Sequence, residues 1–301
     1  MRRVFFYLAV NIVVVLTISI LLNLLGIRPY LSARGINYEG LLIFCAAFGF
    51  LGSFISLQIS RWTAKRAMGV ALIDPDRPRS EAESFLAEKV RSLCARAGLK
   101  TLPEIGVYPN AEVNAFATGP SKERSLLAVS VGLLERMDDE AVEGVLGHEV
   151  AHIANGDMVT MALIQGVVNT FVMFFARVIA FAIDNFLRSD DEGGGLGYFA
   201  YFIVVMLLEN VLFLLALPLI YFFSRWREYR ADAGSARLTS RETMVHALES
   251  LKGHARLVDN RHASVAMFKI HGGDRGLVAL LYSSHPPLDA RIRALRKASS
   301  L

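Results

Sequence analysis

Two histidines and a glutamate stand together near the middle of the chain, in the run HEVAH. His148 and His152 are four residues apart, so on an α-helix both imidazole rings project from one face, about one turn apart. That spacing suits two nitrogen ligands to one Zn²⁺, with Glu149 beside them as a general base for the attacking water. The same letters can arise by chance on a surface helix, so a metal site also requires a helix and a third ligand.

The residues around these side chains have the pattern of a helix. Apolar residues recur at helical spacing at Val142, Leu146, Val150 and Ile153. Asp138 or Asp139 is a suitable N-cap residue, and the pair Gly156 and Asp157 marks a local break or a tight contact. We therefore expect one helix that carries all three side chains and stops near this glycine.

A third ligand is needed, because catalytic zinc commonly has three protein ligands and one position open for water. The later stretch WREYRADAGSA offers Glu228 and Asp232, which are four residues apart and share one helical face. Glu228 suits the ligand role, and Asp232 is better placed to accept a hydrogen bond from the free ring N–H of a ligand histidine. Two alternatives stay open. In the first, Glu228 is not a ligand but pairs with nearby arginines on a solvated helix face. In the second, the third ligand is one of the later histidines: His246, His254, His262, His271 or His285.

The composition is that of a membrane protein. The chain has 301 residues, 53% of them hydrophobic, and a mean hydropathy of +0.41, which is too apolar for an ordinary soluble enzyme. The net charge of +4 would be compatible with nucleic acid, but the basic residues lie beside hydrophobic runs and the sequence has no nucleic-acid motif. With two cysteines, Cys45 and Cys94, it has neither a disulfide framework nor a cysteine metal cluster.

Long apolar segments predict a multi-span α-helical membrane protein in contact with the lipid bilayer. They cover about 4–27, 41–57, 158–187 and 196–224. The first two are long enough to span, whereas the last two could be amphipathic helices only partly in lipid. The acidic turn Arg188–Gly195 joins the last two, and basic residues flank the opposite ends of the segments. This charge pattern predicts that the soluble parts face the cytoplasm.

The rest of the chain predicts a mainly α fold with a small β-sheet. Ser80 is a suitable cap for a helix that continues to about Ala97, after an irregular linker at Ile73–Arg79. Short strands are expected at Pro103–Tyr108, Ala115–Thr118 and Leu126–Ser130. The expected organisation is a transmembrane hairpin at 1–68, a second hydrophobic hairpin at 158–224, and a soluble domain in two parts, 69–157 and 225–301.

Two charged residues lie inside the last two apolar segments. Arg177 and Glu209 fall at similar distances from the connecting turn if both segments are helices that rise about 1.5 Å per residue. Because an unpaired charge at that depth is costly, we expect an ion pair between them. The alternative is that these residues line a polar path for a substrate.

The order of the motifs along the chain resembles that of one known family. NAFATG, HEVAHIANGD, two hydrophobic segments, REYRADAGSA and SSHPPLDARI follow one another as in the HtpX-type membrane zinc metallopeptidases. These enzymes are gluzincins, a group that also contains the type I CAAX prenyl protease. The resemblance covers essentially the whole chain, and it implies a multi-span membrane protein that carries a gluzincin-like zinc peptidase domain.

The resemblance implies a zinc metalloendopeptidase of the bacterial inner membrane whose active site faces the cytoplasm. Its expected substrates are damaged or misfolded membrane proteins, and its expected partners are other membrane quality-control proteases. One Zn²⁺ per chain would be held by His148, His152 and Glu228, with Glu149 as the general base.

Further residues receive candidate roles. Asp157 and Asp232 match acidic positions that support the metal ligands. A strand that aligns an extended substrate is implied at Asn114, Ala115, Phe116 and Ala117; the alternative is a loop beside an ordinary strand. His285 and Arg291 are candidates for stabilising the tetrahedral oxyanion, and the alternatives are a histidine in a turn and an arginine on a helix surface.

Two other classes of function compete with a peptidase. A membrane metal transporter or sensor would hold its ligands within the spans, whereas this motif precedes the third apolar segment and Glu228 follows the fourth. A catalytically inactive zinc-binding scaffold would be expected to have lost part of the motif, which is intact here. The sequence therefore favours zinc-dependent peptide hydrolysis, with the physiological substrates and the cleavage preference left open.

Overall fold

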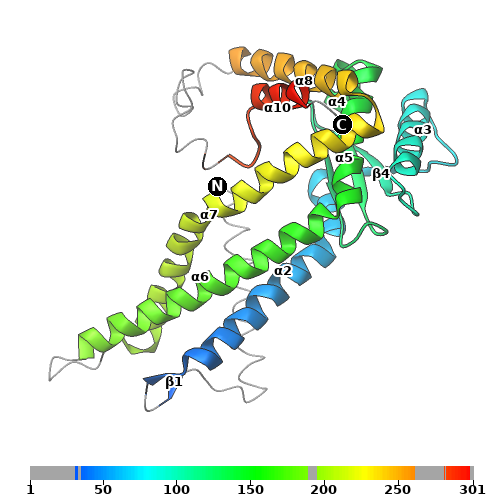
Figure 1. The fold of residues 1–301 in the computed structure, drawn as a ribbon. Coiled ribbons are helices and arrows are strands. Elements are labelled where there is room, and N and C mark those ends of the chain that lie inside the picture. The colour runs from blue at the N-terminus through cyan, green and yellow to red at the C-terminus, as the bar shows by residue number, and fades with distance from the viewer. Residues whose placement is uncertain (1–30, 33–34, 189–194, 262–280, 282, 299–301) are drawn as a thin grey trace. The chain divides into compact units, whose positions relative to one another are not determined.

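The protein is mainly helical with a small β-sheet, as the sequence predicts (Figure 1). The computed structural model describes residues 31–32, 35–188, 195–261, 281 and 283–298. The expected first span, at 4–27, lies outside these residues. The chain divides into two compact units, the first made of 1–48 with 169–210 and the second of 49–168 with 211–301.

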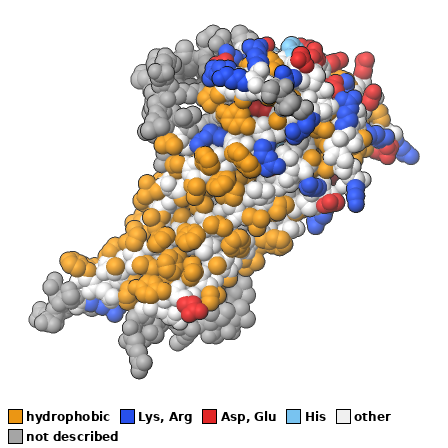
Figure 2. Space-filling view, in the orientation of Figure 1, with side chains coloured by type: hydrophobic (Ala, Val, Ile, Leu, Met, Phe, Trp, Pro, Cys, Tyr) orange, Lys and Arg blue, Asp and Glu red, His pale blue; other side chains and the backbone are white. Residues whose placement is uncertain are grey.

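Within the described residues, three helices are long and apolar enough to cross a membrane. They are α2 (Tyr38–Met68), α6 (Asp157–Arg188) and α7 (Gly197–Leu238). They overlap the apolar segments expected at 41–57, 158–187 and 196–224, and α2 and α7 continue beyond the expected ends to Met68 and Leu238. Figure 2 shows hydrophobic side chains gathered along α6 and α7. Such exposed apolar faces need an apolar environment, which a bilayer supplies.

The first unit contains the ion pair expected at apolar depth. Arg177 Nη1 lies 2.6 Å from Glu209 Oε1 and donates a second hydrogen bond to the Met173 carbonyl at 2.9 Å. The guanidinium carbon also lies 5.6 Å from the centre of the Phe44 ring. The prediction is confirmed, because each of these half-buried charges has its partner. The unit also contains the short antiparallel strands β1 (Leu31–Ser32) and β2 (Gly35–Ile36), which the sequence did not suggest.

The second unit contains a four-stranded sheet with the order β3-β4-β6-β5. Its strands are β3 (Ala71–Ile73), β4 (Glu104–Tyr108), β5 (Ala115–Thr118) and β6 (Leu126–Ser130). β4 and β6 are parallel, and the other two pairs are antiparallel. The three expected strands are confirmed. β3 was not expected, because three residues are too few to show the alternation by which a strand is recognised.

The described part of the second unit also contains five shorter helices: α3 (Glu81–Arg96), α4 (Val131–Arg136), α5 (Asp139–Asn155), α8 (Arg241–Arg261) and α10 (Leu288–Lys297). The expected caps are present, because Ser80 Oγ accepts the Glu83 N–H at 3.2 Å and Asp138 Oδ1 accepts the Ala141 N–H at 2.8 Å. α5 ends at Gly156, whose φ of 70° is left-handed and favours glycine.

α5 runs through the core of this unit. It packs against α3, α8 and β5. Its residues are buried on nearly every side, among them Val145, Leu146 and Val150. A helix surrounded in this way cannot shift without disturbing the close packing of its neighbours, so its side chains are held in fixed positions.

Glycines allow two neighbouring helices to approach α5 closely. A Cβ atom added to Gly144 would lie 2.7 Å from the Cβ of Ala247 in α8. One added to Gly234 of α7 would lie 2.6 Å from the Cβ of Ala151. Both separations are far below an ordinary carbon–carbon contact, so these crossings depend on the missing side chains.

Replacing Gly234 by alanine should lower the free energy of unfolding by about 1–3 kcal/mol, because α7 must move away from α5. Gly253→Ala in α8 is the matched control, since its added methyl group meets open space, and it should raise stability by up to about 1 kcal/mol. Thermal unfolding of both variants in detergent would measure the difference. Equal stability would mean that the crossing at Gly234 is looser than the structure indicates.

Candidate metal centre

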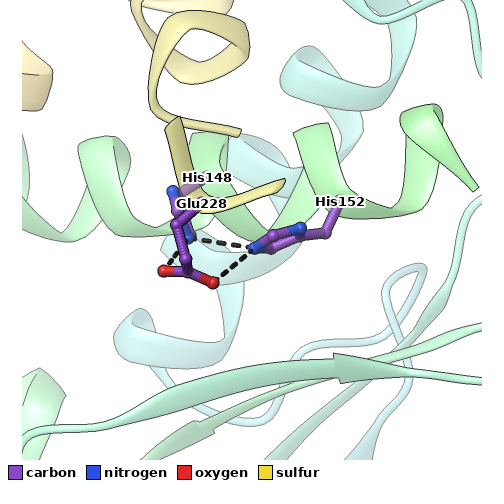
Figure 3. Close-up of side chains that lie close together, drawn as sticks. All are labelled: His148, His152 and Glu228. Atoms are coloured by element: carbon purple, nitrogen blue, oxygen red, sulfur yellow. Dashed lines mark hydrogen bonds and ion pairs between the residues drawn. The ribbon is translucent and has the colours of Figure 1, made fainter. Parts of the chain in front are cut away.

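Two histidines of α5 face a glutamate of α7 (Figure 3). The Nε2 atoms of His148 and His152 are 3.1 Å apart. His148 Nε2 lies 3.6 Å from Glu228 Oε2, and His152 Nε2 lies 3.5 Å from Glu228 Oε1. The structure thus brings the three candidate ligands together. The alternative in which Glu228 lies on a solvated helix face is wrong, because the residue is only 3% exposed.

The spacing of these atoms fits a tetrahedral zinc site. With zinc–nitrogen and zinc–oxygen bonds of about 2.0–2.2 Å, neighbouring ligands of a tetrahedral ion lie roughly 3.3–3.6 Å apart. The separations of 3.1, 3.5 and 3.6 Å lie close to this range. Glu228 Oε2 is buried and makes no hydrogen bond of regular geometry within the described part of the chain, although Arg291 Nη1 and His285 Nδ1 lie within 3.2 Å of it.

A carboxylate lies behind each histidine. Asp232 Oδ1 is 2.9 Å from His148 Nδ1, and Asp157 Oδ2 is 2.6 Å from His152 Nδ1. In both rings Nδ1 therefore faces a carboxylate, and Nε2 faces the centre of the site. Such a partner fixes the orientation of the ring and makes the opposite nitrogen a better ligand.

Arg291 of α10 contacts two of these acidic residues, Asp232 and Glu228, and does not line the cavity. Its Nε donates to Asp232 Oδ2 at 2.8 Å, and its Nη1 lies 3.2 Å from Glu228 Oε2. The alternative of an arginine on a helix surface is wrong, because the residue is 6% exposed. Burial alone would lower the pKa of Arg291, but the hydrogen bond to Asp232 and the charges of Asp232, Glu228 and Glu149 together outweigh burial and raise it, so the charge is permanent.

The candidate ligands open onto a cavity of about 420 Å³. Glu149 lines this cavity, and so does His285, whose side chain is 66% exposed and whose Nδ1 lies 2.9 Å from Glu228 Oε2. Arg291 does not line it. The residues expected to align a substrate also line it, and they belong to β5 or directly precede it: Asn114, Ala115, Phe116 and Ala117.

Three cavity residues received no role from the sequence: Met158, Ser224 and Arg227. Arg227 Nη1 donates to the main-chain oxygen of Asp157 at 3.1 Å, so it connects the start of α6 to α7. The sequence signal that could have pointed to two of them is their position next to candidate site residues, since Met158 follows Asp157 and Arg227 precedes Glu228. Spacing alone does not distinguish these positions from other helical neighbours of a motif.

Both candidate histidine ligands hold protons tightly. Burial alone would lower the pKa of His152, but hydrogen bonds with Asp157 and Glu228 outweigh burial and raise the pKa to about 9. Burial acts in the same way on His148, and the carboxylates of Asp232 and Glu228 raise its pKa as well. A metal ion binds only the unprotonated ring nitrogen, so protons and metal compete for this site.

Comparison with known proteins connects this arrangement to one group of enzymes. The profile described as peptidase family M48 matches residues 80–299. The chain belongs to peptidase family M48. It is 49% identical over 300 residues to "Protease HtpX" of Chromohalobacter salexigens, with 99% of each chain covered. It is also 49% identical over 300 residues to "Protease HtpX homolog" of Bacillus licheniformis, with 98% of each covered. The resemblance to HtpX-type proteases is therefore confirmed.

A solved structure shares the fold of this M48 chain. The crystal structure of S. mikatae Ste24p superposes with a TM-score of 0.66 at 18% sequence identity and covers 97% of this chain. The chain spans 64% of the length of that protein. Together with helices α2, α6 and α7, the family membership makes this chain a membrane metalloprotease. M48 peptidases are zinc-dependent, and the His–His–Glu cluster is a possible site for that ion.

Asp157→Ala should weaken zinc binding by about 10–100-fold, because the His152 ring loses the carboxylate that orients it. Asp139→Ala is the matched control, since this exposed aspartate begins α5 outside the cavity, and it should leave the affinity unchanged. Competition with a chelating dye would measure both affinities in detergent. Unchanged binding by Asp157→Ala would remove the proposed support from His152.

The zinc affinity should also rise as the pH rises from 6.5 toward 9. Below the raised pKa of His152 the ion must displace a proton, so each unit of falling pH should cost up to about tenfold in affinity per displaced proton. Above pH 9 that contribution should disappear. Dye-competition titrations across this range would measure the slope, and His246→Gln, outside the cavity, should not change it. A flat profile would contradict proton competition.

Proposed function

We propose that this M48 protein is a zinc-dependent endopeptidase that hydrolyses peptide bonds of damaged or misfolded membrane proteins at the cytoplasmic face of the bacterial inner membrane. One observation carries the proposal. Glu149 lines the same cavity as His148, His152 and Glu228, whose candidate ligand atoms lie within 4.8 Å of one another. A cavity that combines such a cluster with a carboxylate and an edge strand suits hydrolysis of an extended peptide.

Each residue has a separate part in the proposed chemistry. Lewis-acid activation of water and of the scissile carbonyl is what a Zn²⁺ held by the two histidines and Glu228 would supply. Glu149 takes the proton from the attacking water and later delivers it to the leaving amine nitrogen. His285, at the mouth of the cavity, donates a hydrogen bond to the developing oxyanion. Arg291 acts as a positioning residue, because it contacts Asp232 and Glu228 behind the cavity.

Strand β5 is the proposed binding site for the substrate backbone. It is the last strand in the order of the sheet, and the segment Asn114–Ala117 lines the cavity. Main-chain groups of an edge strand pair with those of any extended peptide, so they align the substrate while leaving its sequence preference weak. Weak preference suits an enzyme that removes damaged chains of many different sequences.

The proposed orientation rests on the positions of basic residues. Arg61, Lys65 and Arg66 follow the apolar part of α2, and Arg225 and Arg230 follow that of α7. Basic residues at the ends of spanning helices favour the cytoplasmic side. An active site on that side would meet the cytoplasmic segments of membrane proteins, and it would be accessible to other membrane quality-control proteases as partners.

Glu149→Gln should leave zinc bound but lower kcat by about 10²–10⁴-fold, because the general base is lost. Glu140→Gln is the matched control: it lies on the same helix, is exposed and does not line the cavity, so it should cleave like wild type. All three proteins would be purified without metal in detergent, loaded with zinc and assayed on an unfolded membrane protein.

Equal cleavage by Glu149→Gln and wild type would refute the assignment of Glu149 as the base. Stoichiometric zinc binding without cleavage by wild type would refute the peptidase. It would favour an inactive zinc-binding scaffold or a membrane metal sensor instead.

A further inference from the structure

The two tryptophans of the chain stand in equivalent settings on two apolar helices. Trp62 of α2 lies under the guanidinium of Arg66 at 5.8 Å, and Trp226 of α7 lies under that of Arg230 at 4.8 Å. Both belong to the second unit, and they are 62% and 51% exposed. Amphipathic aromatic rings and basic residues at the ends of apolar helices are typical of the boundary between a membrane and water.

The exposed apolar surface of both helices reaches these tryptophans. On α2 it includes Ile55 and Ile59, which are each 49% exposed, and on α7 it includes Leu219 and Phe222, which are 52% and 58% exposed. From Arg225 onward, around and after Trp226, the sequence is strongly charged, RWREYRAD. The tryptophans therefore mark the level at which these helices leave the hydrocarbon.

The cavity of the candidate metal centre lies at the same level along α7. Glu228 follows Trp226 by two residues, which is about 3 Å along a helix axis. Ser224 precedes Trp226 by two residues, on the hydrocarbon side, and it also lines the cavity. On α6 the cavity residue Met158 is followed at once by Val159, which is 36% exposed. The cavity is thus bounded by the ends of the apolar helices.

We infer that the cleft opens at the depth of the lipid headgroups, and that the enzyme cuts extended segments of membrane-anchored chains directly beside the bilayer. This inference rests on the proposed peptidase function and specifies its substrates. A segment that leaves a spanning helix and pairs with β5 would present its scissile bond within about ten residues of the lipid, at roughly 3.3 Å per residue. Such a position selects chains by their anchorage to the membrane, because β5 supplies little discrimination by sequence.

The first test uses the tryptophans as depth probes and does not depend on activity. Single-tryptophan proteins, Trp62→Phe and Trp226→Phe in the Glu149→Gln background, would be reconstituted into phosphatidylcholine and phosphatidylglycerol vesicles. Lipids brominated either near the headgroup or near the chain end would then quench their fluorescence. We expect stronger quenching by the shallow bromine for both probes. Stronger quenching of Trp226 by the deep bromine, or no quenching by either lipid, would overturn the inferred depth.

The second test measures the reach of the active enzyme in the same vesicles. A single-span substrate would carry one cleavable segment after a polar spacer of about six, twelve or thirty residues, which extend at most roughly 3.3–3.6 Å per residue. We expect the shortest spacer to be cut within about threefold of the rate of the longest. A loss of more than about tenfold at the shortest spacer would overturn the inference, since an active site well above the membrane requires a longer reach.

The same substrates in detergent separate this inference from the peptidase proposal. Equal cleavage of all spacers in detergent, with only the longest cut in vesicles, would reject the headgroup depth and leave the peptidase intact. Absence of cleavage in both settings, with zinc bound, would reject the peptidase and with it the inference. The Glu149→Gln enzyme should cut none of these substrates, which excludes a contaminating protease.

Discussion

Buried negative charge is the constraint on which the second unit depends. Asp157, Glu228 and Asp232 are only 1–3% exposed, and a carboxylate at such depth is stable as an anion only if a positive charge or hydrogen-bond donor compensates for the lost water. His152 compensates Asp157, and Arg291 compensates Asp232. The carboxylate oxygens of Glu228 lie within 3.6 Å of a nitrogen of both histidine rings and of Arg291. The charges that could attract a divalent ion are thus the same charges that require positive partners in order to be buried.

These partners come from parts of the chain that are distant in sequence, so helix packing must place them accurately. α5 is fixed by burial, and α7 reaches it because Gly234 has no side chain. Arg291 arrives from α10, near the C-terminus of the described chain. A shift of about 1 Å would weaken several hydrogen bonds at once, because their strength falls steeply with distance and angle. The close crossings therefore serve the electrostatics of the site as much as the stability of the fold.

Features with a local signal could be predicted from the sequence, and features that depend on helix crossing could not. The spacing of His148 and His152 places both rings on one face of any α-helix, and Asp138 is a cap by residue type. The side on which α10 presents Arg291 depends instead on how it packs against its neighbours. The reach of Arg227 to the Asp157 carbonyl depends on the same packing. Periodicity within one element does not encode the arrangement of two elements.

The order of the elements has a consequence for how the protein is made. His148 and His152 precede α6, whereas Glu228 lies beyond the apolar part of α7. Because a chain is synthesised from its N-terminus, the ribosome completes both histidines before either of the helices α6 and α7. The cluster cannot form until both helices have been made, because Glu228 lies near the C-terminal end of α7. A chain still in synthesis therefore lacks the assembled His–His–Glu cluster until the last turns of α7 have been made.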